Sequence, residues 1–244
     1  MELLKTRETS KGTKTVICGD AGIGKTTLAS TIPGAIILDA EDGAGQVDCT
    51  RTPVPKNYAE VKEMLRDLYT NAQQYGLKTL VVDSIDKVEA MAITDMLESD
   101  PKHPRTIEQF DGGYGKGYTA IATRMEDFTK IMDSFRAKGI NVVLICHAKI
   151  VHIDNPDTLT PYDVYALNLT KQTRPVITAW ADNLLYIKRE MVTTTTQAHK
   201  TKAVNSERVI ITECTPAFPD TKNRFNLPAR TECTYEAIKN AFRA

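Results

Sequence analysis

Short apolar runs recur along the chain, each about the length of one buried β-strand. Their apolar residues are consecutive rather than alternating with polar ones, which indicates that other elements cover both faces of each strand. The runs are TVIC, AIIL, TLVV, NVVLIC and LLYI, at residues 15–18, 35–38, 79–82, 141–146 and 184–187.

Segments with helical periodicity separate these runs. Residues 57–76 and 121–138 carry apolar positions three and four apart, which is typical of helices that pack one face on a sheet. Residues 25–32 can form a further helix. The side chains expected in the core are Val61, Met64, Leu65, Leu68, Met125, Phe128 and Met132. The alternation predicts an α/β fold with a mostly parallel central sheet and helices on both faces.

The pattern changes after residue 184. Residues 185–200 and 207–214 are rich in β-branched residues and predict antiparallel strands that close the C-terminal edge of the sheet. Two stretches, 101–118 and 152–168, follow neither period. Long irregular segments in a compact domain are often functional or mobile.

Length and charge narrow the possibilities. The 244 residues allow one large α/β domain or one domain with a small appendage. Thirty-one basic and 31 acidic residues balance, so any binding to nucleic acid or to an anionic membrane must be local. The five cysteines form no CxxC pair, and neither a leader-like nor a membrane-spanning apolar segment is present in the sequence. We expect a soluble protein of the cytoplasm with reduced thiols and no zinc site.

The segment GDAGIGKT, residues 19–26, matches the phosphate-loop pattern GxxxxGK[ST]. Glycines let the backbone N–H groups point at phosphate oxygens, and a strand before and a helix after fit the motif better than an ordinary turn. Lys25 would neutralise the β and γ phosphates, and Thr26 would bind Mg²⁺. The predicted nucleotide-binding residues are Gly19, Asp20, Ala21, Gly22, Ile23, Gly24, Lys25, Thr26 and Thr27.

Hydrolysis needs further groups at neighbouring strand ends, where parallel sheets place their ligands. Asp83 follows TLVV and is the predicted second magnesium ligand, although an aspartate there also caps helices. Glu41 in ILDAEDG is the predicted water-activating residue, although turn chemistry accounts equally for Asp39, Glu41 and Asp42. His147 ends NVVLIC and is either a γ-phosphate sensor or a structural residue, and Lys149 is either its assistant or solvated.

The order GDAGIGKT, ILDAEDG, TLVVDSID, VVLICHAK resembles the ATPase core of the RecA/RadA superfamily. With YGKGY and ADNLLYIKRE, it is similar to bacteriophage RecA-like ATP-binding proteins of the single-strand annealing or recombination type. The resemblance covers about residues 12–230. It implies one RecA-like P-loop domain over 1–244, ATP and Mg²⁺ as cofactors, and a homo-oligomer, ring or filament, in the bacterial host cytoplasm. His147 stands where the family usually has glutamine.

The resemblance also implies a basic finger that reaches the ATP of a neighbouring subunit. Lys222 and Arg224 in TKNRFNLP carry over as the candidates, and the alternative is a basic surface turn. Such a finger couples hydrolysis to assembly, because its charge stabilises the transition state only when a neighbour is docked.

In RecA-like filaments two loops face DNA, and by position they fall within residues 103–118 and 150–174. The first loop combines aromatic rings with cations, which suits single strands; its residues are His103, Arg105, Phe110, Tyr114, Lys116 and Tyr118. The second loop is not basic; it holds Asp154, Asp157 and Asp163 against Lys171 and Arg174. A solvated loop is the alternative for both.

Three functions remain open at this point. The first is an ATPase that acts on single-stranded DNA in phage recombination, annealing or replication, together with other proteins of that machinery. The second is a nucleotide-switched assembly or partner-binding ATPase that never contacts DNA. The third is a small-molecule kinase, which the glutamate after the second strand disfavours.

Overall fold

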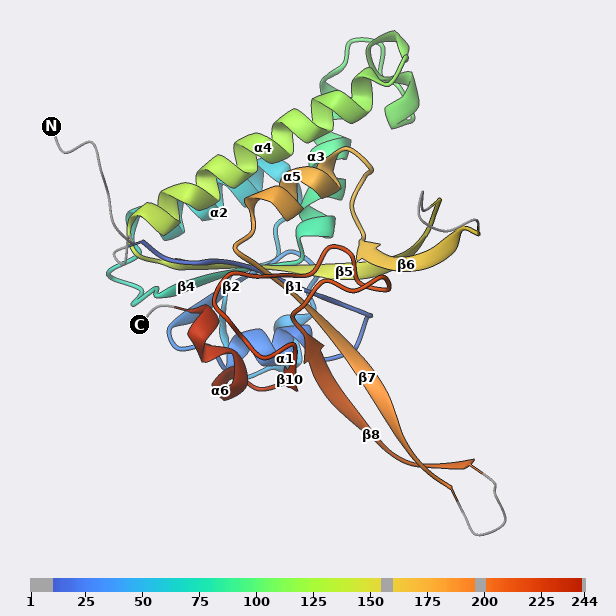
Figure 1. Cartoon of the computed structure of the whole chain (residues 1–244). Coiled ribbons are helices and arrows are strands. Elements are labelled where there is room, and N and C mark those ends of the chain that lie inside the picture. The colour runs from blue at the N-terminus through green and yellow to red at the C-terminus, as the bar shows by residue number, and fades with distance from the viewer. Residues whose placement is uncertain (1–10, 155–159, 196–200, 243–244) are drawn as a thin grey trace, which may run out of the picture.

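The computed structural model describes residues 11–154, 160–195 and 201–242 (Figure 1). Within these ranges the strands form a sheet in the order β10-β8-β7-β1-β5-β4-β2-β3, with β6 added to β5 and β9 to β7. The strands are β1 (Lys14–Gly19), β2 (Ala35–Asp39), β3 (Thr50–Arg51), β4 (Thr79–Asp83), β5 (Asn141–Ile153), β6 (Tyr162–Leu167), β7 (Asn183–Thr195), β8 (Thr201–Ile211), β9 (Lys222–Asn223) and β10 (Arg230–Glu232).

The predicted fold class is confirmed. Strand β1 pairs in parallel with β5 on one side and β7 on the other, and β4 continues the parallel part to β2 and β3. Each predicted apolar run lies within one of these strands. The C-terminal edge is antiparallel, as expected, because β8 pairs antiparallel with both β7 and β10.

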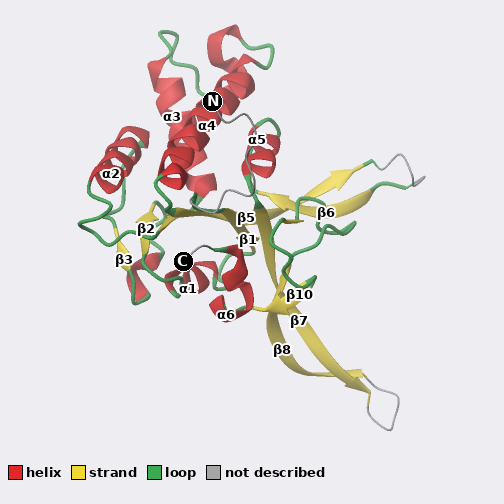
Figure 2. Ribbon diagram, turned by 60° about the vertical axis from the view of Figure 1, so that its left-hand side comes forward, coloured by secondary structure: helices red, strands yellow, loops and turns green. Residues whose placement is uncertain are grey.

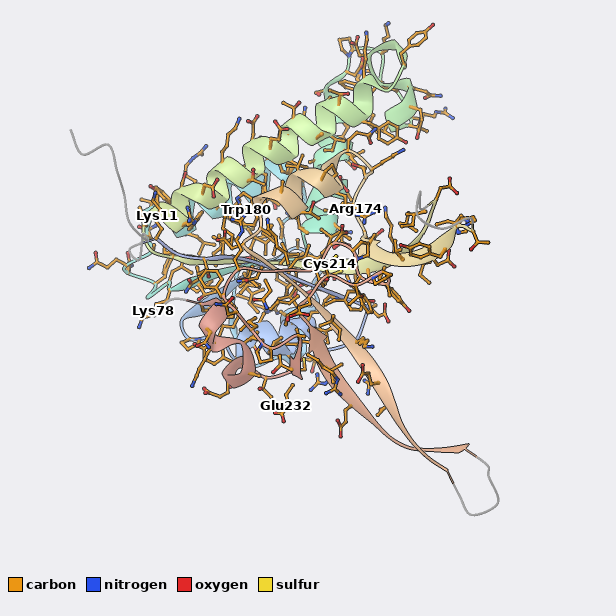
Figure 3. All side chains as sticks on the ribbon, in the orientation of Figure 1. Lys11, Lys78, Arg174, Trp180, Cys214 and Glu232 are labelled. Carbon is orange, nitrogen blue, oxygen red and sulfur yellow. The ribbon has the colours of Figure 1, made fainter. Side chains whose placement is uncertain are left out.

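Helices cover both faces of the sheet (Figures 1 and 2). Helices α2 (Tyr58–Thr70), α3 (Ile85–Ser99), α4 (Lys116–Ala137) and α5 (Thr173–Trp180) lie on one face. Helices α1 (Lys25–Ser30) and α6 (Tyr235–Ile238) lie on the other. Trp180 and Glu232 mark the two sides in Figure 3.

The predicted helical stripes face the core. Val61, Leu65 and Leu68 of α2 and Met125, Phe128 and Met132 of α4 are buried in the larger of two hydrophobic clusters, and Met64 packs against it. A smaller cluster under α1 contains Leu28 together with Phe242 from the C-terminal segment. The C-terminal segment is therefore tied to the same face of the sheet as the phosphate loop.

Both stretches without periodicity have local structure. Residues 101–118 form the 3-10 turn η2 (Ile107–Gly112) and the first residues of α4, which begins at Lys116 and not at 121. In the described part of 152–168, residues 152–153 and 162–167 belong to a β-hairpin, because β5 runs on to Ile153 and pairs antiparallel with β6. Two further 3-10 turns are η1 (Ala44–Gln46) and η3 (Lys239–Ala241). In the described ranges no helix combines the length and the apolar character that crossing a bilayer requires.

Candidate nucleotide-binding and catalytic site

The candidate site lies at the carboxyl ends of four adjacent parallel strands. Strand pairing puts Gly19 of β1 beside His147 of β5, and Asp83 of β4 beside Asp39 of β2. The strand ends therefore bring together segments that are more than 120 residues apart in the sequence, and this is where an open parallel sheet places ligands.

The phosphate loop runs from the end of β1 into α1. Gly24 has a φ of 97°, a left-handed conformation that favours glycine, and it precedes the first residue of the helix. Lys25 is buried, and its Nζ donates to the carbonyl oxygens of Gly19 at 3.0 Å and Asp20 at 2.8 Å. The ammonium group therefore lies across the loop, as a phosphate-binding lysine must.

The two predicted magnesium ligands are in direct contact. Thr26 Oγ1 donates to Asp83 Oδ2 at 2.6 Å. Asp83 is almost fully buried, and burial, with added repulsion from Glu41 and Asp39, raises its pKa to about 6 although the Thr26 hydrogen bond and Lys25 oppose this. A hydroxyl and a desolvated carboxylate are hard oxygen donors, and they fit Mg²⁺.

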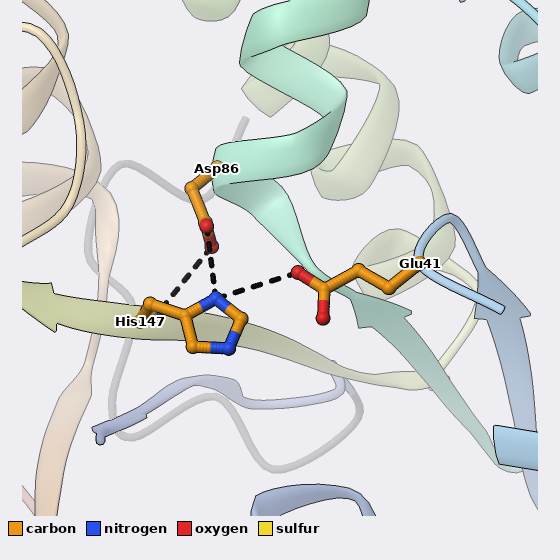
Figure 4. Close-up of side chains that lie close together, drawn as sticks. All are labelled: Glu41, Asp86 and His147. Atoms are coloured by element: carbon orange, nitrogen blue, oxygen red, sulfur yellow. Dashed lines mark hydrogen bonds and ion pairs between the residues drawn. The ribbon is translucent and has the colours of Figure 1, made fainter. Parts of the chain in front are cut away.

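The carboxylate of Glu41 contacts His147 and Ser84, and His147 in turn contacts Asp86 (Figure 4). Glu41 Oε1 lies 3.4 Å from His147 Nδ1 and accepts a short hydrogen bond from the hydroxyl of Ser84. His147 Nδ1 lies 2.9 Å from Asp86 Oδ2, and the backbone N–H of His147 donates to Asp86 Oδ1 at 3.1 Å. The sensor candidate and the water-activating candidate therefore form one cluster with Asp86.

Asp86 sets the charge state of this cluster. Its hydrogen bond to the imidazole raises the pKa of His147. Burial opposes ionisation of Asp86, but the hydrogen bonds from His147 outweigh it and lower the pKa of Asp86. Ligand atoms of Glu41, Asp86 and His147 lie within 4.8 Å of one another. That spacing is short enough for a cation, but the imidazole makes the group a poorer match for Mg²⁺ than Thr26 and Asp83.

Asp39 has a structural role instead of a catalytic one. It is fully buried, and its carboxylate accepts from the N–H groups of Gly43 and Ala44 at 3.1 and 3.3 Å. Arg51 donates to the same carboxylate at 2.8 Å. Turn chemistry therefore accounts for Asp39, which fixes the loop that carries Glu41, while Asp42 is an exposed acid of that loop.

The two candidate fingers lie away from this site within the same chain. Lys222 pairs with Leu184 at the start of β7, the end of the sheet opposite the phosphate loop. Its Nζ donates to the carbonyl oxygens of Thr178, Ala179 and Ala181, at 3.3, 3.3 and 2.6 Å, and so caps the end of α5. Arg224 pairs with Asp182 at 3.1 Å. A role of either residue in a neighbouring subunit stays a prediction.

Arg208 of β8 is a residue that the sequence motifs did not indicate. Its NH1 donates to the carbonyl oxygen of Ile23 at 3.4 Å, and a Cβ at Gly24 would lie 2.2 Å from that nitrogen. The guanidinium therefore lies against the phosphate loop. Arg208 and Ile23 are 185 positions apart in the sequence, and the pairing of β8 with β7 brings them together.

The first expected DNA loop connects α3 to α4 and lies at the end of these helices that projects away from the sheet (Figure 1). Tyr114 is fully exposed there. Lys116 pairs with Asp111 at 2.9 Å, and Tyr118 donates a short hydrogen bond to Glu108.

Three charged or titratable side chains of the second expected loop have partners in the described residues. His152 pairs with Asp163 at 2.9 Å, and Arg174 forms two hydrogen bonds with Asp220, at 2.7 and 2.9 Å. Asp157 lies outside the described residues. Within this loop, His152 and Arg174 therefore lie against carboxylates of the same chain.

Two of three comparisons with known proteins found a match. A family model described as an AAA domain (AAA_24) matches residues 11–225, which include every candidate residue named above. Among solved structures, the chain is similar to the crystal structure of the KaiC-like protein PH0186 from the hyperthermophilic archaeon Pyrococcus horikoshii OT3. The identity is 14%, the TM-score is 0.41, and the match covers 82% of this chain and 79% of that one. No curated protein matches the chain.

Proposed function

The chain belongs to the AAA domain family and carries a P-loop NTPase domain, and from this premise we propose that it is a Mg²⁺-dependent ATPase that acts on single-stranded DNA. The work it drives is recombination, annealing or replication, in a homo-oligomer. The ATPase part depends on one observation above all. Lys25, the Thr26–Asp83 pair and Glu41 converge at the ends of adjacent strands.

Each residue has a distinct task in hydrolysis. Lys25 balances the charge that builds up on the β and γ phosphates, and Thr26 and Asp83 would hold Mg²⁺, which would supply further positive charge for the transition state. Glu41 accepts the proton of the attacking water. His147, oriented by Asp86, fixes the carboxylate of Glu41 from the other side.

Substitution of Glu41 tests its assignment. Glu41→Gln keeps the acceptor for the Ser84 hydroxyl but cannot take a proton, so we expect kcat to fall by about 100-fold or more while ATP affinity stays within about threefold. Phosphate release and calorimetric binding measure the two quantities. The control is Asp42→Asn, an exposed acid one position along the loop. Normal turnover by Glu41→Gln would move the role of base elsewhere.

Lys25→Ala tests the site as a whole. Removal of the ammonium leaves the phosphate charge unbalanced, so nucleotide binding and turnover should both be lost. The variant should remain folded by circular dichroism, because the lysine contacts only its own loop among the bonds described here. Full activity in this variant would refute the ATPase proposal.

The proposal that DNA is the substrate is supported by Tyr114. A completely exposed ring among four glycines and near-by cations is what a stacking platform for unpaired bases offers. Aromatic stacking contributes about 1–3 kcal/mol per base, so Tyr114→Ala should weaken binding of labelled single-stranded DNA by about tenfold. Fluorescence anisotropy at two salt concentrations, with and without ATP and Mg²⁺, measures this.

The matched control is Tyr75→Ala, a second exposed tyrosine that follows α2. It should leave DNA binding unchanged. If the wild-type protein binds no DNA at low salt in either nucleotide state, the DNA part of the proposal is wrong while the ATPase part stands.

One observation favours a second candidate, a nucleotide-switched protein that binds a partner protein and never contacts DNA. Cations of both expected DNA loops are paired with carboxylates of the same chain, as in Lys116–Asp111 and Arg174–Asp220. Neutralised cations contribute little to a phosphate contact. A pull-down that depends on ATP and is insensitive to nuclease would support this candidate over the first.

A further inference from the structure

A cavity of about 400 Å³ opens beside the phosphate loop and is distinct from the catalytic cluster. Its walls come from three distant parts of the chain: Thr27, Leu28 and Thr31 on the α1 side, Arg208 of β8, and residues 233–236. Residues 233–236 lie beyond the part of the chain that the family model matches. The volume is in the range of sites for small molecules.

The cavity lies on the side of β1 where a nucleoside should emerge. The catalytic groups Glu41, Asp83 and His147 stand on β2, β4 and β5 or the loops that follow them, to one side of β1 in the sheet. Arg208 lies within β8, on the other side of β1, and residues 233–236 follow β10 at the edge of that side. A triphosphate whose γ end faces Glu41 has its α end at the start of α1, and its nucleoside then continues toward the second side.

The cavity offers a ring and apolar surface. Tyr235 is half-buried, and Phe242 backs it with ring centroids 6.0 Å apart, so the tyrosine is held in place. Leu28 supplies apolar surface to the same cavity. Aromatic rings that are fixed in this way gain from stacking on a flat partner.

Three polar side chains of the cavity have local partners. Thr31 donates to the carbonyl of Leu28 at 2.7 Å, Thr234 accepts from the N–H of Ala237 at 3.3 Å, and Glu236 pairs with Lys239 at 2.9 Å. These three side chains bond to the local backbone or to a lysine, so we expect stacking on Tyr235 to contribute more to affinity than they do.

We propose that residues 233–236, with Tyr235 as the stacking ring, hold the purine base of a nucleoside triphosphate whose phosphates occupy the loop. The proposal rests on the proposed ATPase function for the position of the phosphates. The C-terminal segment then takes part in ligand binding. The site recognises the flat face of a base by stacking, and not the hydrogen-bonding groups at its edge.

Calorimetric titration with ATP and with inorganic tripolyphosphate, each with Mg²⁺, separates the base from the phosphates. Tyr235→Ala should weaken ATP binding by about tenfold, the loss expected for one stacked ring, and leave tripolyphosphate binding within about twofold. Tyr235→Phe keeps the ring and should bind ATP as the wild type does. Because stacking reads the ring rather than its edge, GTP should bind within about tenfold of ATP.

Each other result has a definite meaning. Unchanged ATP affinity in Tyr235→Ala, or equal losses for ATP and tripolyphosphate, would overturn the proposal. So would wild-type protein that binds tripolyphosphate as tightly as ATP, although the phosphate site would then stand. Wild-type protein that binds neither ligand would instead refute the proposed function, and Lys25→Ala gives the reference for that outcome.

Discussion

At the scale of single residues, the site combines two carboxylates with opposite environments. Asp83 is desolvated and its pKa is raised, whereas Asp86 is stabilised as an anion by His147 and its pKa is lowered. The two residues are three positions apart in the sequence. The carboxylate of Asp83 therefore gains stability when a cation binds, whereas the carboxylate of Asp86 is already stabilised by the imidazole of His147.

Neutralising Asp83 should stabilise the protein in the absence of Mg²⁺ and nucleotide. Its pKa of about 6 lies above the ordinary 3.8, so the stability from its protonated form is full below pH 4 and is lost as pH rises through 6. Asp83→Asn should thus raise the free energy of unfolding by about 1–3 kcal/mol at pH 7.5 and change it little at pH 4. Urea unfolding at the two pH values measures the difference.

The same variant should lose Mg²⁺-dependent turnover, because an amide is a poor ligand for the ion. An equal change in stability at both pH values would contradict the raised pKa. Stability and catalysis therefore oppose each other at this position.

At the scale of elements, the loop after β2 is a small unit built around Asp39. Asp39→Ala removes the acceptor for two backbone N–H groups and for Arg51, so we expect a loss of stability of about 2–4 kcal/mol. Because this loop carries Glu41, kcat should fall in the folded fraction while ATP affinity changes little. Unfolding curves and single-turnover kinetics measure both. Asp39→Asn, which keeps one acceptor, should recover part of each loss, and normal kcat in Asp39→Ala would show that the loop does not position Glu41.

The sequence predicted the parallel strands and α2 and α4 because their apolar residues repeat without interruption. Helix α3 lacks such a clear stripe, because its buried face includes Glu89. Three hydrogen bonds from the backbone and hydroxyl of Thr170 satisfy that carboxylate. A buried charge with a partner 81 residues away cannot be inferred from local periodicity. The first turn of α4 was not predicted for a different reason: Gly115 and Gly117 flank its first residue, Lys116, and glycine disfavours helices.

The phosphate loop, Glu41, Asp83 and His147 were predictable as a group because each follows an apolar strand. Asp86 lay within the quoted segment TLVVDSID, but only its contact with His147 distinguishes it from an ordinary acid in the first turn of a helix. Arg208 had no local signal, because its place depends on the pairing of β7 and β8.

At the scale of the whole molecule, the β7–β8 hairpin and the α3–α4 tip project from the sheet in different directions (Figure 1). The phosphate loop lies at the carboxyl ends of the parallel strands, and β9 pairs with the first residues of β7, at the opposite ends. A finger beside β9 can act only on another subunit's nucleotide. Assembly is therefore the condition for any catalytic role of Arg224.

Arg224→Ala should reduce ATP turnover in concentrated protein and have no effect at dilutions where sizing shows a monomer. The reason is that a charge donated from a neighbour stabilises the transition state only when that neighbour is docked. The control is Arg230→Ala, a comparably exposed arginine that pairs with Glu190. An equal defect in dilute monomer would rule out a role across an interface.

Lys222 adds a condition of its own. Its ammonium closes the end of α5 by bonding three carbonyl groups, and burial lowers its pKa. A neighbour that drew this lysine away would leave those carbonyls to find water or new donors. Recruitment of Lys222 into catalysis at a neighbouring subunit would therefore destabilise the end of α5 in the subunit that donates the lysine. Association of two subunits would thus change the stability of a helix within one of them.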